Sequence, residues 1–151
     1  MIVLALDPGT HESGYCRYDG ERVISAGVMG NDDLLKVVRD DNSDALAIEK
    51  IVSYGSAVGQ ETFDTCVWIG RFIEAWGVPE DVMLIPRRKV KAEVCGPGKW
   101  GDPDVRKALL TRVGPSGTKK APGPTYGVTS HAWSALACAV TALAEMEKAN
   151  G

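Results

Sequence analysis

Two acidic residues, Asp7 and Glu49, each stand directly after a short apolar run, residues 2–6 and 45–48. Runs of this length that are closed by turn residues, such as Pro8 and Gly9 after Asp7, are typical of buried strands. A carboxylate in such a position costs stability unless it is solvated, hydrogen-bonded or bound to a cation. Two strand-end acids that meet at one edge of a sheet can share a divalent cation, and two ordinary acids that face water are the alternative.

The charge is unevenly distributed along the chain. Residues 1–85 carry 6 Lys and Arg against 15 Asp and Glu, whereas residues 86–120 carry 10 against 3. A protein that binds a phosphate backbone needs a local basic surface of this kind more than it needs a high net positive charge. The alternative, a solvated helix with a surplus of lysines, does not explain why the same segment is also rich in Gly and Pro.

Turn residues and apolar periodicity divide the chain into short elements. Strands are expected over residues 2–7, 13–18, 21–29, 45–49 and 82–85, the second and third joined by a hairpin at Asp19-Gly20. Helices are expected over residues 31–39, 61–76, 87–94, 103–113 and 130–148, with Gly- and Pro-rich loops at 96–101 and 114–127. Asn31 is the expected N-cap of the first helix, and Gly77 is expected to end the second.

This order of elements resembles that of an RNase H-like domain. It predicts one α/β domain over residues 1–151, with a five-stranded mixed sheet, three antiparallel strands and then parallel ones, flanked by helices on both faces.

Composition narrows the class of protein. At 151 residues, with 44% hydrophobic and 25% charged residues, the chain suits one domain with a full core. No apolar run approaches the roughly 20 residues of a membrane helix and no secretion pattern is present, so we expect a cytoplasmic protein without a membrane partner. The four cysteines lack CxxC spacing and only two histidines are present, which argues against a structural zinc site and fits a reducing compartment.

Four motifs resemble those of one known family. They are Leu4-Ala5-Leu6-Asp7-Pro8-Gly9-Thr10 with Gly14-Tyr15, Leu46-Ala47-Ile48-Glu49, Val90-Lys91 with Gly96-Pro97-Gly98-Lys99, and Ser130-His131-Ala132-Trp133-Ser134-Ala135-Leu136-Ala137. In this order, and spread over nearly the whole chain, they resemble the RuvC family of Holliday-junction resolvases, more closely its short bacteriophage branch. The resemblance implies a homodimeric endonuclease that cleaves four-way or other branched DNA, in the host cytoplasm if the gene is carried by a phage.

The resemblance also implies a metal site. Phosphodiester hydrolysis benefits from divalent cations that activate water and stabilise the leaving oxygen, and Mg²⁺, with Mn²⁺ as a substitute, prefers carboxylate ligands. Asp7 and Glu49 are the implied metal-binding pair, and His131 is the implied third ligand. Ser134 stands where many members carry an acid, so the catalytic set is Asp7, Glu49, His131 and Ser134.

Ser134 leaves three explanations open. The site binds metal weakly, or another acid swings in, or an aspartate has been replaced to trap a substrate. The acids that could swing in are Glu12, Asp102 and Asp104.

The resemblance also implies residues that contact DNA and residues that form the dimer interface. The expected DNA contacts are Arg87, Arg88, Lys89, Lys91, Lys99 and Lys107. The family's wedge aromatic falls on Val52, and Tyr54 in the next turn is the candidate substitute, an ordinary surface tyrosine being the alternative. Trp68 and Phe72, on a helix with more large apolar groups than one face needs, are expected at a homodimer interface, ordinary core being the alternative.

Three competing functions follow from the same residues. The Asp7-Pro8-Gly9-Thr10 turn also resembles the first phosphate loop of actin-like ATPases and sugar kinases, but that reading needs a second domain of similar size. A junction-binding protein that kept the fold and lost the site is supported by Ser134. A small RNase H-like nuclease acting on RNA or flaps is the third alternative.

Overall fold

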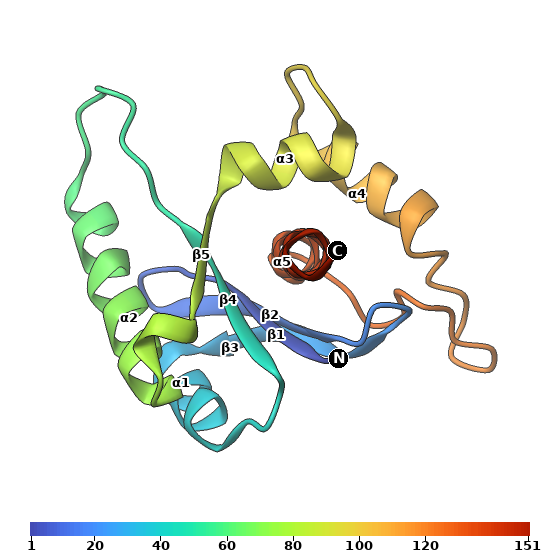
Figure 1. Cartoon of the computed structure of the whole chain (residues 1–151), viewed down its shortest axis with the longest axis horizontal. Coiled ribbons are helices and arrows are strands. Elements are labelled where there is room, and N and C mark those ends of the chain that lie inside the picture. Colours follow the sequence, from blue (N-terminus) through green and yellow to red (C-terminus); the bar gives the residue numbers. More distant parts are fainter.

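The computed structural model describes all residues, 1–151, and is built on one five-stranded sheet (Figure 1). The strands are β1 (Val3–Asp7), β2 (Glu12–Tyr18), β3 (Val23–Gly30), β4 (Ala45–Lys50) and β5 (Met83–Pro86). Their order across the sheet is β3-β2-β1-β4-β5. The first three strands are antiparallel, whereas β4 and β5 run parallel to β1, so the mixed sheet predicted from the sequence is confirmed.

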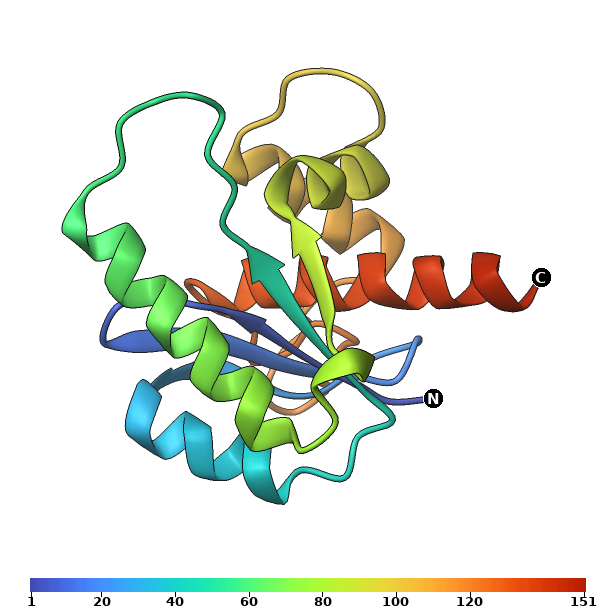
Figure 2. The ribbon, with the colours of Figure 1, turned by 60° about the vertical axis from the view of Figure 1, so that its left-hand side comes forward.

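Helices cover both faces of the sheet (Figure 2). They are α1 (Asn31–Asp40), α2 (Gln60–Trp76), α3 (Arg87–Cys95), α4 (Asp102–Arg112) and α5 (Ala132–Asn150), with a short 3₁₀ turn, η1, over Pro79–Asp81. Helices α1 and α2 pack on one face, and α5 packs on the other with α3 and α4 outside it. No helix combines the length and the apolar character that crossing a membrane requires.

Alternation along the strands separates two buried cores. In β1, Leu4 and Leu6 face α1 and α2, whereas Val3 and Ala5 face α5. In β4 the same alternation sends Ala45 and Ala47 toward α5. The next residue of this parity in each strand is the acid that ends the apolar run, so the alternation directs both acids to the α5 face.

The last helix is buried on nearly all sides because the sheet lies beneath it and α3 and α4 lie over it (Figure 1). Five of its eleven buried residues are alanines, namely Ala132, Ala135, Ala137, Ala139 and Ala142. Small side chains let the helix backbone approach the strands closely. This close approach carries the start of α5 to the strand ends where the two acids lie.

The observed elements lie within two residues of the expected ones, but the expected N-cap of α1 is wrong. The N-cap is Gly30, and Asn31 is the first helical residue. The Asn31 side chain is buried, accepts a hydrogen bond from the Ser13 hydroxyl and donates one to the Gly9 carbonyl. It therefore braces the turn that follows Asp7 instead of capping its own helix. Gly77 does end α2, with a φ of 92°.

Candidate metal and nucleic-acid site

Asp7 and Glu49 lie side by side at the carboxyl ends of two parallel strands. Leu6 of β1 is paired with Ile48 of β4, and the two acids are the next residue in each strand. Their side chains are only 17% and 11% exposed. The sheet therefore holds two largely buried carboxylates together at the α5 face, the arrangement expected from the sequence.

Asp7 titrates abnormally because of this environment. Burial raises the pKa of Asp7 to about 7, and the negative charge of Glu49 adds to the rise. His131 and Arg87 lower the same pKa but offset only part of the shift. An acid with such a pKa lacks sufficient positive charge around it, and a cation bound beside it favours its ionised form.

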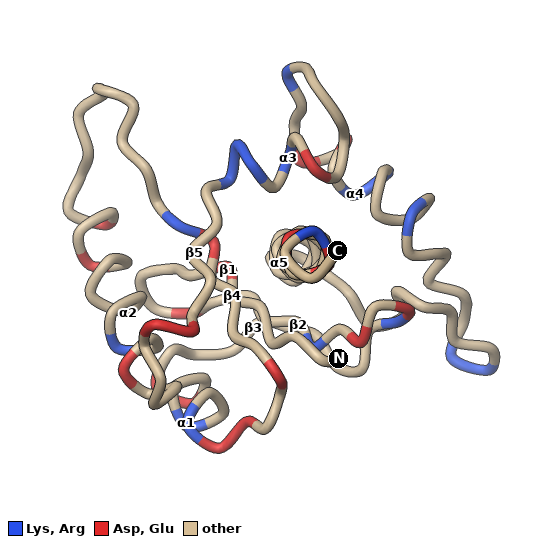
Figure 3. Tube along the Cα trace, in the orientation of Figure 1, with Lys and Arg blue, Asp and Glu red and all other residues tan.

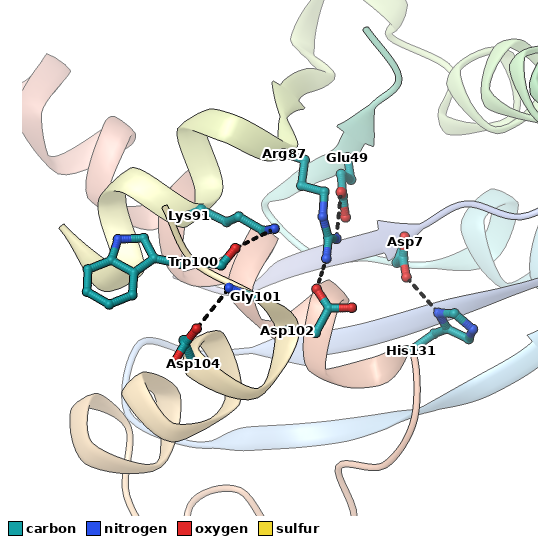
Figure 4. A network of polar contacts seen from close by, with 9 residues as sticks. All are labelled: Asp7, Glu49, Arg87, Lys91, Trp100, Gly101, Asp102, Asp104 and His131. Atoms are coloured by element: carbon teal, nitrogen blue, oxygen red, sulfur yellow. Dashed lines mark hydrogen bonds and ion pairs between the residues drawn. The ribbon is translucent and has the colours of Figure 1, made fainter. Parts of the chain in front are cut away.

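His131 completes this group from the start of α5. Its Nδ1 lies 3.2 Å from Asp7 Oδ2 (Figure 4). The approach depends on Gly14, which is paired with Asp7 across β1 and β2, because a Cβ on Gly14 would lie 2.4 Å from the His131 carbonyl oxygen. Ser130 enters the helix with a left-handed φ of 50°, a strained conformation of the kind that clusters at functional sites.

Ser134 lies near the same group. It lines a cavity of about 500 Å³ between α5 and the α3–α4 pair, together with Glu49 and His131. His131 and Ser134 therefore face the same cavity, as their three-residue spacing predicts. A hydroxyl in this position supplies no charge, so the carboxylates of the site are two where three or four would hold a metal ion more tightly.

Arg87 is the cation that this site contains. Its Nη1 lies 3.1 Å from Glu49 Oε1, and its Nη2 donates to the Asp102 carboxylate (Figure 4). It therefore lies between two acids, with 41% of its side chain exposed. With Arg87 between Glu49 and Asp102, the structure contains no group of three or more His, Cys, Asp and Glu side chains close enough to hold a metal ion.

The three acids considered as replacements for Ser134 differ in position. Asp102 lines the same cavity as Ser134, and the Arg87 guanidinium bridges it to Glu49. Asp104 instead accepts a hydrogen bond from the Gly101 backbone at the start of α4. Glu12 lines neither cavity of the site. Asp102 is therefore the only one of the three that lies beside the acid pair.

A second hollow, which we call the cleft, opens from the acid pair. It has a volume of about 560 Å³ and lies between the β4–α2 loop, residues 51–59, and α3 with the loop that follows it. Basic residues gather along α3 and α4, whereas acidic residues dominate around α1 (Figure 3). Of the expected DNA contacts, those that line the cleft are Arg87, Arg88, Lys91, Lys99 and Tyr54.

Two of the expected DNA contacts lie elsewhere. Lys89 points toward α5, where its Nζ lies 2.9 Å from Glu145 Oε2. It does not line the cleft, whereas its neighbour Arg88 does. Lys107 lines the cavity beside Ser134 instead. The basic residues therefore divide between two hollows that meet at Glu49 and Arg87.

Aromatic residues occur on both sides of the cleft. Tyr54 is exposed, and the Arg88 guanidinium lies 4.2 Å from the centre of its ring. Trp100, which sequence reasoning missed, lines the cleft from the loop between α3 and α4. The signal that could have identified it is a large aromatic residue within a Gly- and Pro-rich loop, where core packing does not require one.

The side of helix α2 that faces solvent is not the side that carries Trp68 and Phe72, the residues expected at the dimer interface. Phe72 is fully buried in the core between α2 and the sheet, so its assignment to a dimer interface is wrong. Trp68 is partly buried and packs beside Phe72. The exposed apolar residues are Phe63 and Val67, at 56% and 63%. Their spacing of four residues was the missed signal, because it places both on the face opposite the buried residues.

Comparison with solved structures establishes the fold. A structure of Thermus thermophilus RuvC in complex with a Holliday junction substrate matches with a TM-score of 0.76 and 20% identity, over 99% of this chain and 96% of that one. A second structure of T. thermophilus RuvC matches with a TM-score of 0.72 and 22% identity, over 97% of each chain. No family model and no curated protein matches this sequence. The chain has a RuvC-like, RNase H-like fold, whereas the bacteriophage branch stays a prediction.

Proposed function

We propose that this protein is a divalent-metal-dependent endonuclease that binds and cleaves four-way (Holliday) or other branched DNA as a homodimer. The observation that carries the proposal is the pair of buried carboxylates, Asp7 and Glu49, at the inner end of a basic cleft. The RuvC-like fold supports a nuclease, and the matched RuvC structure that contains a Holliday junction supports a branched substrate.

The two buried carboxylates are of the type that a hard divalent cation prefers as ligands. Asp7 and Glu49 would hold Mg²⁺, or Mn²⁺ in its place, with His131 as the third ligand. The raised pKa of Asp7 supports this fit, because a cation bound beside this buried carboxylate would favour its ionised form. When bound, the cation supplies an activated water and a charge that stabilises the leaving oxygen.

The chain's own residues bind and orient the DNA strand. Arg88, Lys91 and Lys99 present positive charge along the cleft, which attracts a phosphate backbone without reading its sequence. A phosphate in the cleft also offers Arg87 a new bidentate partner, because a guanidinium pairs with phosphate as readily as with carboxylate. The incoming strand would thereby release Glu49 from Arg87.

A homodimer would give the protein two such sites. Symmetric cutting of a four-way junction requires two active sites related by a two-fold axis. The exposed pair Phe63 and Val67 on α2, beside the partly buried Trp68, is the apolar surface that we assign to the dimer contact.

A gel assay tests the proposed activity. A labelled four-way junction and a linear duplex of the same sequence are incubated with wild-type protein in Mg²⁺, Mn²⁺ or Ca²⁺. We expect cleavage of the junction in Mg²⁺ and Mn²⁺. The Asp7→Asn variant should cut at least about a hundredfold more slowly and still bind, because a metal ion supplies several kcal/mol to the reaction. Cleavage by Asp7→Asn at the wild-type rate would remove the proposed mechanism.

Two observations favour a second function, a junction-binding protein without activity. Ser134 adds no carboxylate to the site, and Glu49 is paired with Arg87. In that case the wild-type protein binds the junction in preference to the duplex but cuts neither in any of the three cations. Equal binding of junction and duplex would contradict both functions.

A further inference from the structure

Trp100 is an aromatic residue that is only partly buried. It belongs to neither hydrophobic core and lies on the loop of residues 96–101, between α3 and α4. Trp100 lines the cleft, and 37% of the residue is exposed. A ligand that covers a large apolar ring in this position gains binding free energy, because a large apolar area is removed from water.

The loop holds the Trp100 ring in one orientation. The indole Nε1–H donates to the Gly96 carbonyl at 2.9 Å. Lys91 Nζ donates to the Trp100 carbonyl at 2.9 Å (Figure 4). One part of the ring packs on Gly98, where a Cβ would lie 3.2 Å from it. A ring fixed before binding loses little conformational entropy when a partner stacks on it.

The other wall of the cleft also carries an aromatic ring. The β4–α2 loop and the α3–α4 loop both extend from the same end of the molecule (Figures 1 and 2). Tyr54 lies on the first of these loops and is held by the Arg88 guanidinium. Lys91 and Lys99 add positive charge to the same cleft. Lys91 keeps two further N–H donors after its bond to Trp100, so it can still bind a phosphate.

Rings and cations arranged in this way suit an unpaired nucleotide. Proteins bind single strands by placing phosphates on basic groups and stacking bases on aromatic side chains. A base inside a duplex is already stacked on both neighbours and offers no free face. The volume of about 560 Å³ lies in the range of small-ligand sites, which fits one nucleotide and not a double helix.

We propose that the cleft binds one unpaired nucleotide of the DNA strand, with its base stacked on Trp100 and its phosphate on Lys91 and Lys99. The inference rests on the proposed function and deepens it, since it requires a substrate with an unpaired nucleotide near the branch point. Asp7 and Glu49 line the same cleft as Lys91 and Trp100, so a nucleotide stacked on Trp100 would share the cleft with the acid pair. Trp100 is thus a specificity-determining residue outside the metal site.

A comparison of base-containing and abasic DNA tests this proposal. All proteins carry Asp7→Asn, so that the DNA stays intact, and the probes are four-way junctions with an abasic site at each nucleotide beside the branch point in turn. One of these abasic sites should weaken binding about tenfold when Trp100 is present and less than about twofold in Trp100→Leu. Trp100→Phe should retain most of the difference, because it keeps an aromatic face.

The control variant is Tyr126→Leu, which removes an exposed aromatic ring that lines neither cavity. It should behave as the parent protein does. A second readout is 2-aminopurine at the sensitive position, whose fluorescence should fall on binding to the parent protein and not on binding to Trp100→Leu. The proposal would be overturned if, at each abasic site, the parent protein and the Trp100→Leu variant lost the same amount of affinity.

The outcome also separates this inference from the proposed function. The wild-type protein could cut the junction while the loss of affinity at abasic sites is the same with and without Trp100. That result would contradict the stacking site and leave the proposed function intact. If the junction is bound no better than a duplex, the proposed function fails, and the same abasic comparison is made on a single-stranded oligonucleotide. A Trp100-dependent loss there supports the stacking site, and its absence contradicts it.

Discussion

Among the single residues of the site, Asp7 is the most unusual. The positive charge of His131 and Arg87 is too small to offset the effects of burial and of Glu49 on its carboxylate. Its pKa of about 7 in the folded protein stands against 3.8 for an ordinary aspartate. The folded state therefore holds a proton over a range of pH in which the unfolded chain has lost it. The stability that this proton contributes is fully present below pH 4 and is lost as the pH rises through about 7.

We expect Asp7→Asn to stabilise the metal-free protein at pH 8 by about 2 kcal/mol and to have little effect at pH 4. The amide resembles the protonated acid and carries no charge to repel Glu49. Urea unfolding of both proteins in EDTA at the two pH values measures the difference. Added Mg²⁺ should then stabilise only the wild type. An equal effect of the substitution at both pH values would contradict the assigned environment of Asp7.

Ser134 offers a second test at the same scale. Ser134→Asp adds a carboxylate to the cavity that Glu49 and His131 line, so the affinity for Mn²⁺ should rise by about tenfold or more, or about 1.4 kcal/mol. Isothermal titration calorimetry measures it. Ser25→Asp, which adds the same charge on the exposed edge strand β3, is the control. An affinity no higher than that of the control would mean that position 134 does not face the metal.

At the scale of elements, the site depends on how closely α5 approaches the sheet. Gly14→Ala places a methyl group where the His131 backbone now lies, so the start of α5 must move. We expect a loss of about 1–3 kcal/mol in the free energy of unfolding, together with weaker Mn²⁺ binding. Gly30→Ala, which meets no atom within 4 Å, is the control. Unchanged metal affinity in a folded Gly14→Ala protein would show that His131 is not a ligand.

The sequence was sufficient for the elements because their signals are local. The apolar runs that end at Asp7 and Glu49 marked two strands, and the period of two directed both acids to one face. The turn residues Pro8 and Gly77 fixed where elements stop. These features depend only on neighbouring residues, so a single sequence reveals them.

Side-chain partners across the fold could not be predicted in the same way. Arg87 follows β5 directly, and only the pairing of β5 with β4 places it beside Glu49. Asn31 was expected to cap α1 but binds Ser13 and Gly9 instead. Phe72 was assigned to the surface because the sequence alone did not define which side of α2 meets the sheet. Each error concerns tertiary packing, which residue type and spacing leave undetermined.

At the scale of the whole molecule, the proposed dimer depends on the outer face of α2. The double variant Phe63→Glu with Val67→Lys removes both exposed apolar groups and leaves a favourable pair of charges one turn apart on the helix. We expect a folded monomer by analytical ultracentrifugation and the loss of paired cuts in a four-way junction. Ile24→Thr, on the exposed edge strand β3, should stay dimeric as the control. A dimer that persists in the double variant would exclude this face of α2.

In the mechanism that we propose, Asp7 and Glu49 act together as one cation site. Crystals grown with Mn²⁺ and measured near the manganese absorption edge locate the ion directly. We expect an anomalous peak between the carboxylates of Asp7 and Glu49, within ligand distance of His131, with Arg87 turned away from Glu49. Fully occupied manganese elsewhere, with Arg87 still bound to Glu49 in the same crystals, would contradict this mechanism.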